Sequence, residues 1–593
     1  MLREAQDLLV LSVGGDLPPS RQATLLAAGR AALGASGVVS LAGPSTTAPP
    51  DGPGWMAFTQ GAHLVGGRRL GSSELPELLT SSDGAGLARL APPFSGAARD
   101  ASGGWTFATD SAGLAHVYWA QGSGWSVAST SAAALAQLTG AGLDETALGV
   151  FAVSGSYLGD ATPFRGVRKL QAGMRCRLVG GRAQVERYAP VVVPRTRYPD
   201  LTTAVTHGSR AISAAVGDAL AGYPDPTIEL SGGLDSRLLL AAIPVHEREG
   251  MRAVTVGDPE AEDCVLAREI SRRCRLDHTW IDLGKIAELD PSEAHSLALG
   301  AARRRDYGAN ALAGAVLDWV EGQLEQCPRL SGQNGEFGRG FYYALQREGG
   351  EVTARRIDRL ARWRVFANDR VEPLLFDPAF AADAETRALE AVRGVFTAGG
   401  PEGRAEWLPE TDEFYLAARM QRWLGPGYTV GARDRVILAP FFHPEYLDWV
   451  RRTRPADRRR SRAVAGVLDR LDPELGALPL DCRPPPSVLA KPPMVSAARD
   501  ARSVVSKTAG KVRQRIRLRP RAPVGAARLA DLVARWWADD PAALEPVAAL
   551  SFLDADAVMA IARGDRPATP TTIAFLVTLE GVTSERAWSR GSV

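Results

Sequence analysis

The spacing of apolar residues divides the chain into two parts near residue 200. In the first part, short apolar stretches are separated by turns rich in Gly, Ser and Pro, a pattern that predicts short strands. A helix is predicted over STSAAALAQL, where Ser129, Thr130 or Ser131 can serve as the N-cap. Together these features predict an antiparallel, α+β domain. The predicted strands lie in LLVLSVGG, GVVSLAG, WMAFTQGAHLVGG, GGWTFATDSAG and HVYWAQGSGWSVAS.

In the second part, predicted strands and helices alternate, which is typical of a parallel α/β sheet. Residues 189–201 contain three prolines and are predicted to be a linker. Residues from about 310 to 462 are predicted to be mainly helical, and a proline-rich stretch near residue 483 opens a tail that ends in helices. The alternating elements are a helix over TTAVTHGSRAISAAVGDAL, a strand at 227–230, a helix from Asp235, a strand over MRAVTVG, a helix over EDCVLAREISRRC and a strand over HTWIDL.

Length indicates a multidomain protein, and composition indicates neither nucleic acid nor a membrane as its general partner. A chain of 593 residues is long enough for two or three domains, and its net charge of +2 gives no overall indication of nucleic acid or membrane. No apolar run approaches the ~18 residues of a membrane helix, and no signal peptide is expected. The five cysteines are scattered, which predicts reduced thiols and a cytoplasmic protein. Two basic stretches, at residues 458–462 and 507–521, are typical of solvated faces, with an acidic leader peptide or RNA as alternative ligands.

The stretch TIELSGGLDSRLLLA, residues 227–241, carries the strongest indication of chemistry. Glycines between a strand and a helix let the backbone curl tightly, and we expect the N–H groups of Gly232, Gly233 and the next residues to face outward, where anions bind. Ser231 and Ser236 add hydroxyl donors, and Asp235 can hold Mg²⁺ against phosphate. This pattern predicts a pyrophosphate-binding loop, and the alternative is a glycine turn that only caps a helix. The loop is not a Walker loop, because it lacks Gly-Lys-Ser.

The Ser-Gly-Gly-x-Asp-Ser motif resembles the loop of ATP pyrophosphatases, which cleave ATP between the α- and β-phosphates and leave an adenylate on a substrate oxygen. Three more stretches resemble the asparagine synthetase-like (class B) family: AVTVGDPEAEDCVLAREISRRCRLDHTWIDL, LSGQNGEFGRGFYY and VILAPFFHPEYLDWV. The last is a packing element in that family, and Asp263 falls where an acid usually follows the loop. The resemblance implies ATP and Mg²⁺ as cofactors and Asp235 and Glu336 as metal ligands. The implied ATP-binding residues are Leu230, Ser231, Gly232, Gly233, Asp235, Ser236, Val256 against adenine, and Gly332 near the ribose or adenine.

The first part of the chain is similar to the glutaminase domain of that family, in FATDSAGLAHVYWAQGSGWSVASTSAAALAQL and TPFRGVRKLQAGMRCRL. The resemblance covers most of residues 90–485. It implies an Ntn-hydrolase-like (glutaminase-like) α+β sandwich over residues 1–190 and an α/β ATP-pyrophosphatase synthetase domain over residues 191–593. The second domain includes a helical insert between Tyr343 and Thr411 and a divergent basic tail. The family nucleophile is a cysteine directly after the initiator Met, where this chain has Leu2, so we expect a degenerate scaffold that makes no ammonia.

The synthetase part also departs from the family pattern. Gln333 stands where asparagine synthetase has a Glu site residue, and Pro485 stands where the family has a lysine. Lys491 is the substitute candidate for the cation that stabilises the tetrahedral intermediate, and an ordinary surface lysine is the alternative. Glu413 is a candidate base for the attacking amine. Arg419 is either structural or a phosphate contact.

Relatives that do not use glutamine include β-lactam synthetase and the lasso-peptide cyclases. Chain length, the helical insert and the long tail favour a peptide substrate, so we expect a macrolactam synthetase of the lasso-peptide type. Such an enzyme adenylates an Asp or Glu side chain of a precursor peptide, and the N-terminal amine then closes an isopeptide ring. The resemblance implies a precursor peptide, a leader-binding protein and a leader peptidase as partners, with no nucleic acid or membrane. Alternatives are a β-lactam synthetase-like or asparagine synthetase-like ligase acting on a small molecule, a tRNA-modifying enzyme, and a binding protein without catalysis.

Overall fold

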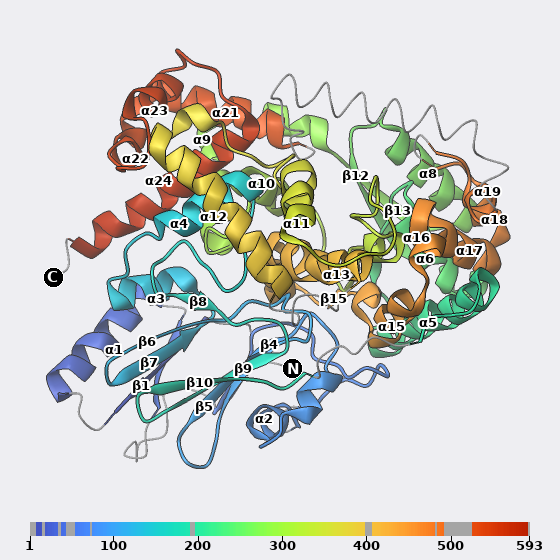
Figure 1. Ribbon diagram of the computed structural model, residues 1–593, viewed down its shortest axis with the longest axis horizontal. Helices are drawn as coiled ribbons and strands as arrows, with labels where there is room; N and C mark the ends of the chain where they lie inside the picture. The colour runs from blue at the N-terminus through green and yellow to red at the C-terminus, as the bar shows by residue number, and fades with distance from the viewer. Residues whose placement is uncertain are drawn as a thin grey trace.

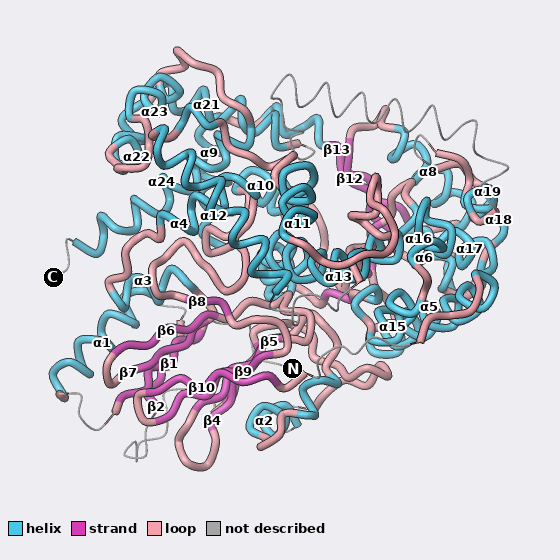
Figure 2. The backbone as a smooth tube through the Cα atoms, in the orientation of Figure 1, coloured by secondary structure: helices cyan, strands magenta, loops and turns pink. Residues whose placement is uncertain are grey.

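A computed structural model of the protein describes residues 7–14, 18–33, 37–42, 54–71, 74–189, 196–397, 406–480, 483–491 and 525–590. Over these residues the chain is a mixed α/β structure with three five-stranded sheets (Figures 1 and 2). Two sheets lie in the lower part of Figure 1, and the third lies to the right, surrounded by helices. The expectation of a mixed α and β structure is confirmed at this level.

The first two sheets are antiparallel except for one pair of strands. Strands β1 and β2 run parallel, because α1 (Pro19–Leu33) lies between them in the chain and returns it to the same end of the sheet. The sequence reasoning missed this helix, so the expectation of a purely antiparallel first part was wrong here. One sheet has the order β2 (Val38–Ala42), β1 (Leu8–Val13), β7 (Trp125–Ser129), β6 (Tyr118–Gly122), β8 (Arg168–Lys169). The other has the order β10 (Arg182–Arg187), β9 (Met174–Val179), β5 (Trp105–Thr109), β4 (Ser95–Arg99), β3 (Trp55–Ala57).

Strand β1 shows how these sheets are held together. Its side chains alternate between the two faces of the sheet. Leu8 and Val10 are buried between the sheets in a cluster with Phe107 of β5, whereas Leu9 and Leu11 pack on the outer side with residues of α3 (Ala132–Thr139) and α4 (Glu145–Ser154). On the far face of the second sheet, α2 (Glu74–Thr80) and η1 (Ala85–Arg89) contribute to a further apolar cluster. The two sheets therefore form a sandwich with helices outside it.

The third sheet is entirely parallel and has the order β13-β12-β11-β14-β15. The chain enters at the central strand β11, builds outward to β13 and then continues on the other side of β11. The boundary between β11 and β14 is therefore a topological switch point, where open α/β sheets bind ligands at the carboxyl ends of the strands. The helix α8 begins and ends at the residues predicted for it. The elements are α5 (Leu201–Gly222), β11 (Thr227–Glu229), α6 (Leu234–Ala242), α7 (Val245–Arg248), β12 (Arg252–Gly257), α8 (Glu262–Cys274), β13 (Asp277–Asp282), β14 (Arg329–Leu330) and β15 (Ile437–Leu438).

The segment from residue 310 to 462 is mainly helical over its described residues, as predicted. Two of its helices, η4 and η6, are π-helical. The helices from residue 283 to 434 are η2 (Leu283–Glu288), α9 (Pro291–Arg304), α10 (Ala311–Glu321), η3 (Gly335–Arg339), α11 (Ala354–Leu360), η4 (Ala361–Val365), η5 (Pro373–Leu375), α12 (Pro378–Thr397), α13 (Trp407–Phe414), η6 (Tyr415–Leu424) and α14 (Gly425–Asp434). Those that follow are η7 (Pro440–Phe442), α15 (Pro444–Arg452), α16 (Pro455–Arg458), η8 (Arg459–Ser461), α17 (Arg462–Leu471), α18 (Pro473–Ala477) and α19 (Pro486–Leu489).

The C-terminal helices, red in Figure 1, belong to the body of the protein. They pack against α9 and α10, and Phe575 stacks on Phe151 of α4 with 6.2 Å between ring centroids. One buried cluster extends from Leu9 of β1 to Trp537, so packing crosses the expected boundary near residue 190. The second basic stretch, residues 507–521, lies outside the described residues. The helices are α21 (Ala526–Asp539), η10 (Pro541–Leu544), α22 (Glu545–Ala548), α23 (Ala555–Ala562) and α24 (Pro570–Arg590).

Three further expectations concern single features. Among the possible N-caps of α3 the structure selects Ser131, whose Oγ accepts from the N–H of Ala134 at 3.2 Å. The cysteines at 176, 264, 274 and 327 are free, and Cys482 lies outside the described residues. None of the helices in the described ranges is long and apolar enough to cross a membrane.

Candidate functional site

The Ser-Gly-Gly loop leaves the carboxyl end of β11 and leads into α6, at the switch point of the third sheet. Hydrogen bonds within the loop hold it in one conformation. Ser236 Oγ accepts from the N–H of Ser231 at 3.1 Å and donates to the carbonyl of Ser231 at 3.0 Å. The N-cap residue Gly233 provides no side-chain hydrogen bond to the first turn of α6. The positive end of this helix therefore opens at the carboxyl edge of the sheet.

The expectation that both glycine N–H groups face outward is wrong for this conformation. The N–H of Gly232 donates to the carbonyl of Asp263 at 3.1 Å, and the N–H of Gly233 donates to Ser231 Oγ at 3.1 Å. A Cβ on Gly232 would lie 2.7 Å from Cβ of Leu266, so this glycine is required for close packing against α8. Anion binding at this loop would fall to the first-turn N–H groups of α6, beginning with Leu234.

The two predicted acids lie on either side of an arginine. Arg339, in η3, donates to Oδ2 of Asp235 at 2.5 Å and lies 3.8 Å from Oε1 of Glu336. Burial raises the pKa of Asp235, the charge of Arg339 opposes this rise, and the charge of Glu336 adds to it. The other carboxylate oxygen of Asp235, Oδ1, is buried without a hydrogen-bond partner. This arrangement leaves Oδ1 of Asp235 without a donor, so a cation can bind there in addition to Arg339.

The acid pair suits Mg²⁺ when phosphate oxygens complete its shell. Protein sites for Mg²⁺ commonly use one or two carboxylates together with water and substrate phosphates. In the part of the chain that the structure describes, no group of three or more His, Cys, Asp or Glu side chains forms a metal site.

Two glycines of the second motif bring it against the loop. A Cβ on Gly335 would lie 2.4 Å from Cγ of Asp235, so the side chain of Asp235 occupies the space that any larger residue would need. A Cβ on Gly332 would lie 3.6 Å from the backbone nitrogen of Ser236, which is ordinary contact distance. The motifs at residues 230–236 and 330–336 thus meet in space, as the switch point requires. VILAPFFHPEYLDWV lies beside them as a packing element, since Asn334 donates to the carbonyl of Phe441 at 2.8 Å.

The other residues predicted to bind ATP lie at the same edge of the sheet. Leu230 is buried, and its N–H donates to the carbonyl of Val254 in β12 at 2.9 Å. Val256, near the end of β12, is 40% exposed, which leaves an apolar surface available for a base. Gln333 is exposed next to Gly332, and Glu336 is 39% exposed.

The remaining catalytic candidates are not brought into contact with the acid pair. Glu413, on α13, forms a two-pronged ion pair with Arg451 of α15, at 2.8 and 3.0 Å. Lys491 is exposed just after α19, at the end of a described range. The cations that act on Asp235 are those of Arg339 and Arg483. Sequence reasoning missed both, although Arg339 lies in the same Gly-rich motif as Glu336.

The first basic stretch, residues 458–462, is a solvated face only in part, because Arg460 is exposed whereas Arg458 is buried. Arg458 is 3% exposed and donates to both carboxylate oxygens of Asp412, at 2.5 and 2.9 Å. It also donates to the hydroxyl of Tyr343 at 2.8 Å. Arg459 donates to the carbonyls of Tyr343 and Gln346 at 2.9 and 2.7 Å. These arginines hold the segment after η3 in position, which excludes Arg458 as a ligand for RNA or an acidic peptide in this conformation.

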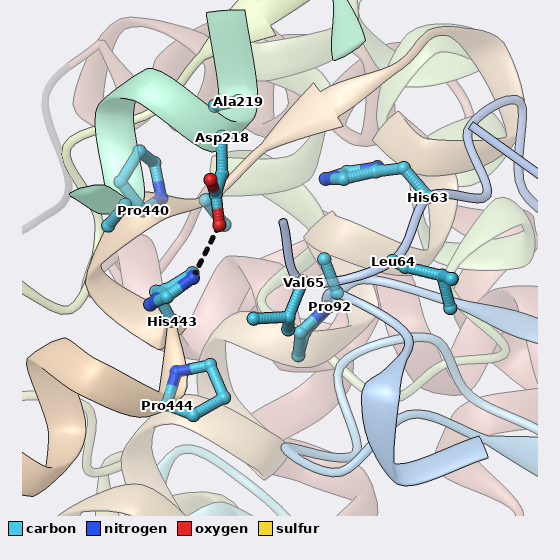
Figure 3. Close-up of a pocket in the computed structure, with 12 residues that line it drawn as sticks. His63, Leu64, Val65, Pro92, Asp218, Ala219, Pro440, His443 and Pro444 are labelled. Atoms are coloured by element: carbon cyan, nitrogen blue, oxygen red, sulfur yellow. Dashed lines mark hydrogen bonds and ion pairs between the residues drawn. The ribbon is translucent and has the colours of Figure 1, made fainter. Parts of the chain in front are cut away.

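Two cavities lie away from this edge of the sheet. A small one of about 20 Å³ is lined by His63, Asp218 and His443 (Figure 3), where Nε2 of His443 lies 3.1 Å from Oδ2 of Asp218. That space holds little more than a water molecule. A wider cavity of about 960 Å³ is lined by residues that precede β11 and β12, such as Asp225 and Met251, so it opens at the amino ends of the strands. Ligands of open α/β sheets bind at the opposite, carboxyl edge, and we assign the site there.

No protein-family model matches the chain, and no curated protein is similar to it at a significant level. The geometry of the site therefore carries the functional interpretation.

Proposed function

We propose that the protein is an ATP-dependent, AMP-forming carbon–nitrogen ligase that adenylates a carboxylate and transfers the acyl group to an amine. The observation that carries this proposal is the meeting of the Ser-Gly-Gly loop, Asp235 and Glu336 at the switch point of a parallel sheet. A helix N-terminus suits phosphate, and two neighbouring acids suit the magnesium ion that accompanies it. In this proposal the third sheet is an ATP-pyrophosphatase fold, and the first two sheets are a glutaminase-like sandwich.

The nucleotide would lie along the carboxyl edge of the third sheet. The first-turn N–H groups of α6, beginning with Leu234, would contact its phosphates, Gly332 would leave room for the sugar, and Val256 would contact adenine. Asp235 and Glu336 would hold Mg²⁺, which when bound supplies positive charge for the pyrophosphate leaving group. Arg339 is already aimed at both acids and would supply a second cation at the same point.

The reaction would proceed in two steps. A carboxylate oxygen of the substrate attacks the α-phosphorus of ATP, the bond to the β-phosphate oxygen breaks, and pyrophosphate leaves. The amine nitrogen then attacks the acyl carbon and loses a proton, the bond to the AMP oxygen breaks, and AMP leaves. When both groups belong to one peptide, the product is a macrolactam, and we propose this as the specific activity. The helical insert, whose Arg364 feels the charge of Glu336, favours a substrate larger than an amino acid.

The two-sheet sandwich would act as a support for the site. Nε2 of His116, next to β6, lies 2.9 Å from the carbonyl of Gln421 in η6, and Nε of Arg422 donates to the carbonyl of Tyr157 at 3.2 Å. Helix η6 also carries Tyr415, whose ring lies 6.4 Å from that of Phe337 in η3. The sandwich thus contacts the same helix that lies beside η3, and this contact gives it a role without glutaminase chemistry.

The test is ATP consumption with identification of products by mass spectrometry, using synthetic peptides that carry a free N-terminal amine and one internal Asp or Glu. We expect AMP, pyrophosphate and a peptide lighter by one water. Asp235→Asn should abolish turnover while thermal unfolding remains cooperative. The matched control is Asp225→Asn. Asp225 lies just before β11, at the end of the strand opposite to the loop, and its side chain is exposed. AMP without a lighter peptide would indicate a ligase for small molecules, and no AMP with any acid and amine would refute the proposal.

A further inference from the structure

Two arginines from separate helices lie against one aromatic ring, that of Phe341. Arg364 lies in η4 and Arg419 lies in η6, the two π-helical segments of the described chain. Wide helical turns of this kind are rare and often occur at functional sites. The Cζ atom of Arg419 lies 4.9 Å from the ring centre of Phe341, and that of Arg364 lies 5.4 Å from the same ring. Segments more than 50 residues apart therefore bring two cations to one aromatic ring.

The described contacts of the two cations are with uncharged groups. Arg364 donates to the carbonyl of Phe341 at 2.9 Å, and Nε of Arg419 is buried without a hydrogen-bond partner. Over the described ranges, neither guanidinium forms an ion pair. Asp369 is close enough to feel the charge of Arg419, yet burial still raises the pKa of Asp369. Two half-buried like charges that form no direct ion pair are costly, so this arrangement favours an anionic ligand.

The arginine pair adjoins the proposed site of chemistry. Burial and the charge of Arg419 lower the pKa of Arg364, and the negative charge of Glu336 opposes this change. The charge of Glu336 also adds to the raised pKa of the neighbouring Tyr342, which is caused mainly by burial. The ring of Tyr415 lies 5.1 Å from that of Phe341, and its buried hydroxyl has no hydrogen-bond partner. Trp363, which precedes Arg364 in η4, is 56% exposed. Arginine and aromatic side chains of this kind are enriched where proteins bind peptides and other proteins.

We propose that Arg364 and Arg419, with Phe341 and Tyr342, form a subsite that binds a carboxylate of the substrate, separate from the nucleotide. This inference rests on the proposed function and adds the substrate class: an acidic peptide, with a second carboxylate beside the one that is activated. Planar guanidinium groups held by stacking are arranged for planar carboxylates. The nucleotide phosphates are the other possible source of an anion, and the Gly-rich loop serves them better.

The experiment measures two affinities on the full-length protein. Fluorescence anisotropy with fluorescein-labelled hexaglutamate reports on the subsite, with labelled hexaglutamine as the neutral probe, and calorimetry with Mg²⁺ and a non-hydrolysable ATP analogue reports on the nucleotide site. We expect hexaglutamate to bind at least tenfold more weakly to Arg364→Gln and to Arg419→Gln, with nucleotide affinity unchanged. The hexaglutamate affinity of Arg364→Lys and of Arg419→Lys should lie between those of the wild type and the Gln variants. Lysine keeps the positive charge but lacks the planar guanidinium group that stacks on the ring. Circular dichroism and thermal unfolding show whether each variant is folded.

The matched control is Arg362→Gln in the same π-helix, because Arg362 is exposed and already pairs with Glu385 at 3.6 Å. Equal weakening in this control, or equal binding of hexaglutamine, would overturn the subsite. Weaker nucleotide binding in the Arg364 and Arg419 variants would show that the two arginines bind the phosphates of the nucleotide. This result would also overturn the carboxylate subsite. If the wild-type protein binds hexaglutamate through these arginines and binds no nucleotide, the subsite stands and the proposed ligase function fails.

Discussion

Replacement of Gly335 by alanine tests whether the contact between the two motifs is as close as the structure has it. The added Cβ would lie 2.4 Å from Cγ, 2.6 Å from Cβ and 2.6 Å from Oδ1 of Asp235, whereas ordinary contacts begin at 3.4 Å. The methyl group and Asp235 must therefore separate by about 1 Å. The backbone of Gly335 does not have a positive φ, so alanine is excluded by Asp235 and not by backbone strain.

The expected cost is about 1–3 kcal/mol in the free energy of unfolding, the usual range for overpacking. The same displacement weakens the bond between Asp235 and Arg339, so turnover of ATP in the proposed reaction should also fall. Urea unfolding followed by circular dichroism measures the first effect, and release of AMP measures the second.

Two control substitutions isolate the contact. Gly332 lies in the same loop as Gly335. Gly332→Ala adds a methyl group 3.6 Å from its nearest neighbour, the backbone nitrogen of Ser236, and we expect a change in unfolding free energy below about 0.5 kcal/mol. Gly217→Ala adds a methyl group with nothing within 4 Å, inside α5, and should stabilise by about 0.5–1 kcal/mol. If Gly335→Ala is as stable as Gly332→Ala, Asp235 does not lie against Gly335 and the proposed geometry of the acid pair is refuted.

Two further predictions concern charged groups away from that contact. Burial raises the pKa of Asp306 from 3.8 to about 7, so the folded protein binds more protons than the unfolded chain between these values, and its stability falls as pH rises through that window, by up to about 4 kcal/mol. Asp306→Asn should abolish this part of the pH dependence in urea midpoints measured from pH 4 to 8, and an unchanged slope would contradict the assignment. Because Glu413 is paired with Arg451 and is 39% exposed, Glu413→Gln should cost less than about 1 kcal/mol and reduce turnover less than tenfold. A hundredfold or larger loss of turnover would instead support the role of Glu413 as the base.

Local patterns in the sequence were sufficient for the elements whose residues interact with near neighbours. Helix α8 spans the predicted residues because its apolar positions recur at helical spacing and acids begin it. The strand and the helix at residues 227–242 were likewise predictable, because the apolar strand residues stop at Ser-Gly-Gly and a leucine-rich helical segment follows. The alternation of strands and helices also predicted a parallel sheet with the loop at the carboxyl end of its first strand.

Contacts between distant segments decided the features that the pattern did not contain. The helix α1 and the parallel pairing of β1 with β2 depend on which strands become neighbours, and a weakly patterned alanine-rich stretch does not encode that choice. Arg458 looks like part of a basic surface run, yet Asp412 and Tyr343 bury it, because a charge enters a core only where partners from other segments meet it. The same reasoning applies to Arg339 between Asp235 and Glu336, and to Arg364 and Arg419 around Phe341.

The sequence by itself therefore determined the Gly-rich loop and the strands and helices around it, such as β11, α6 and α8, since these follow from interactions within a few residues. Only the tertiary structure decided the strand order, the partners of the buried charges and the two arginines beside the acid pair. These features depend on which distant residues come into contact when the hydrophobic cores form. Arg364 and Arg419, for example, are more than 50 positions apart in the chain and lie against the same ring.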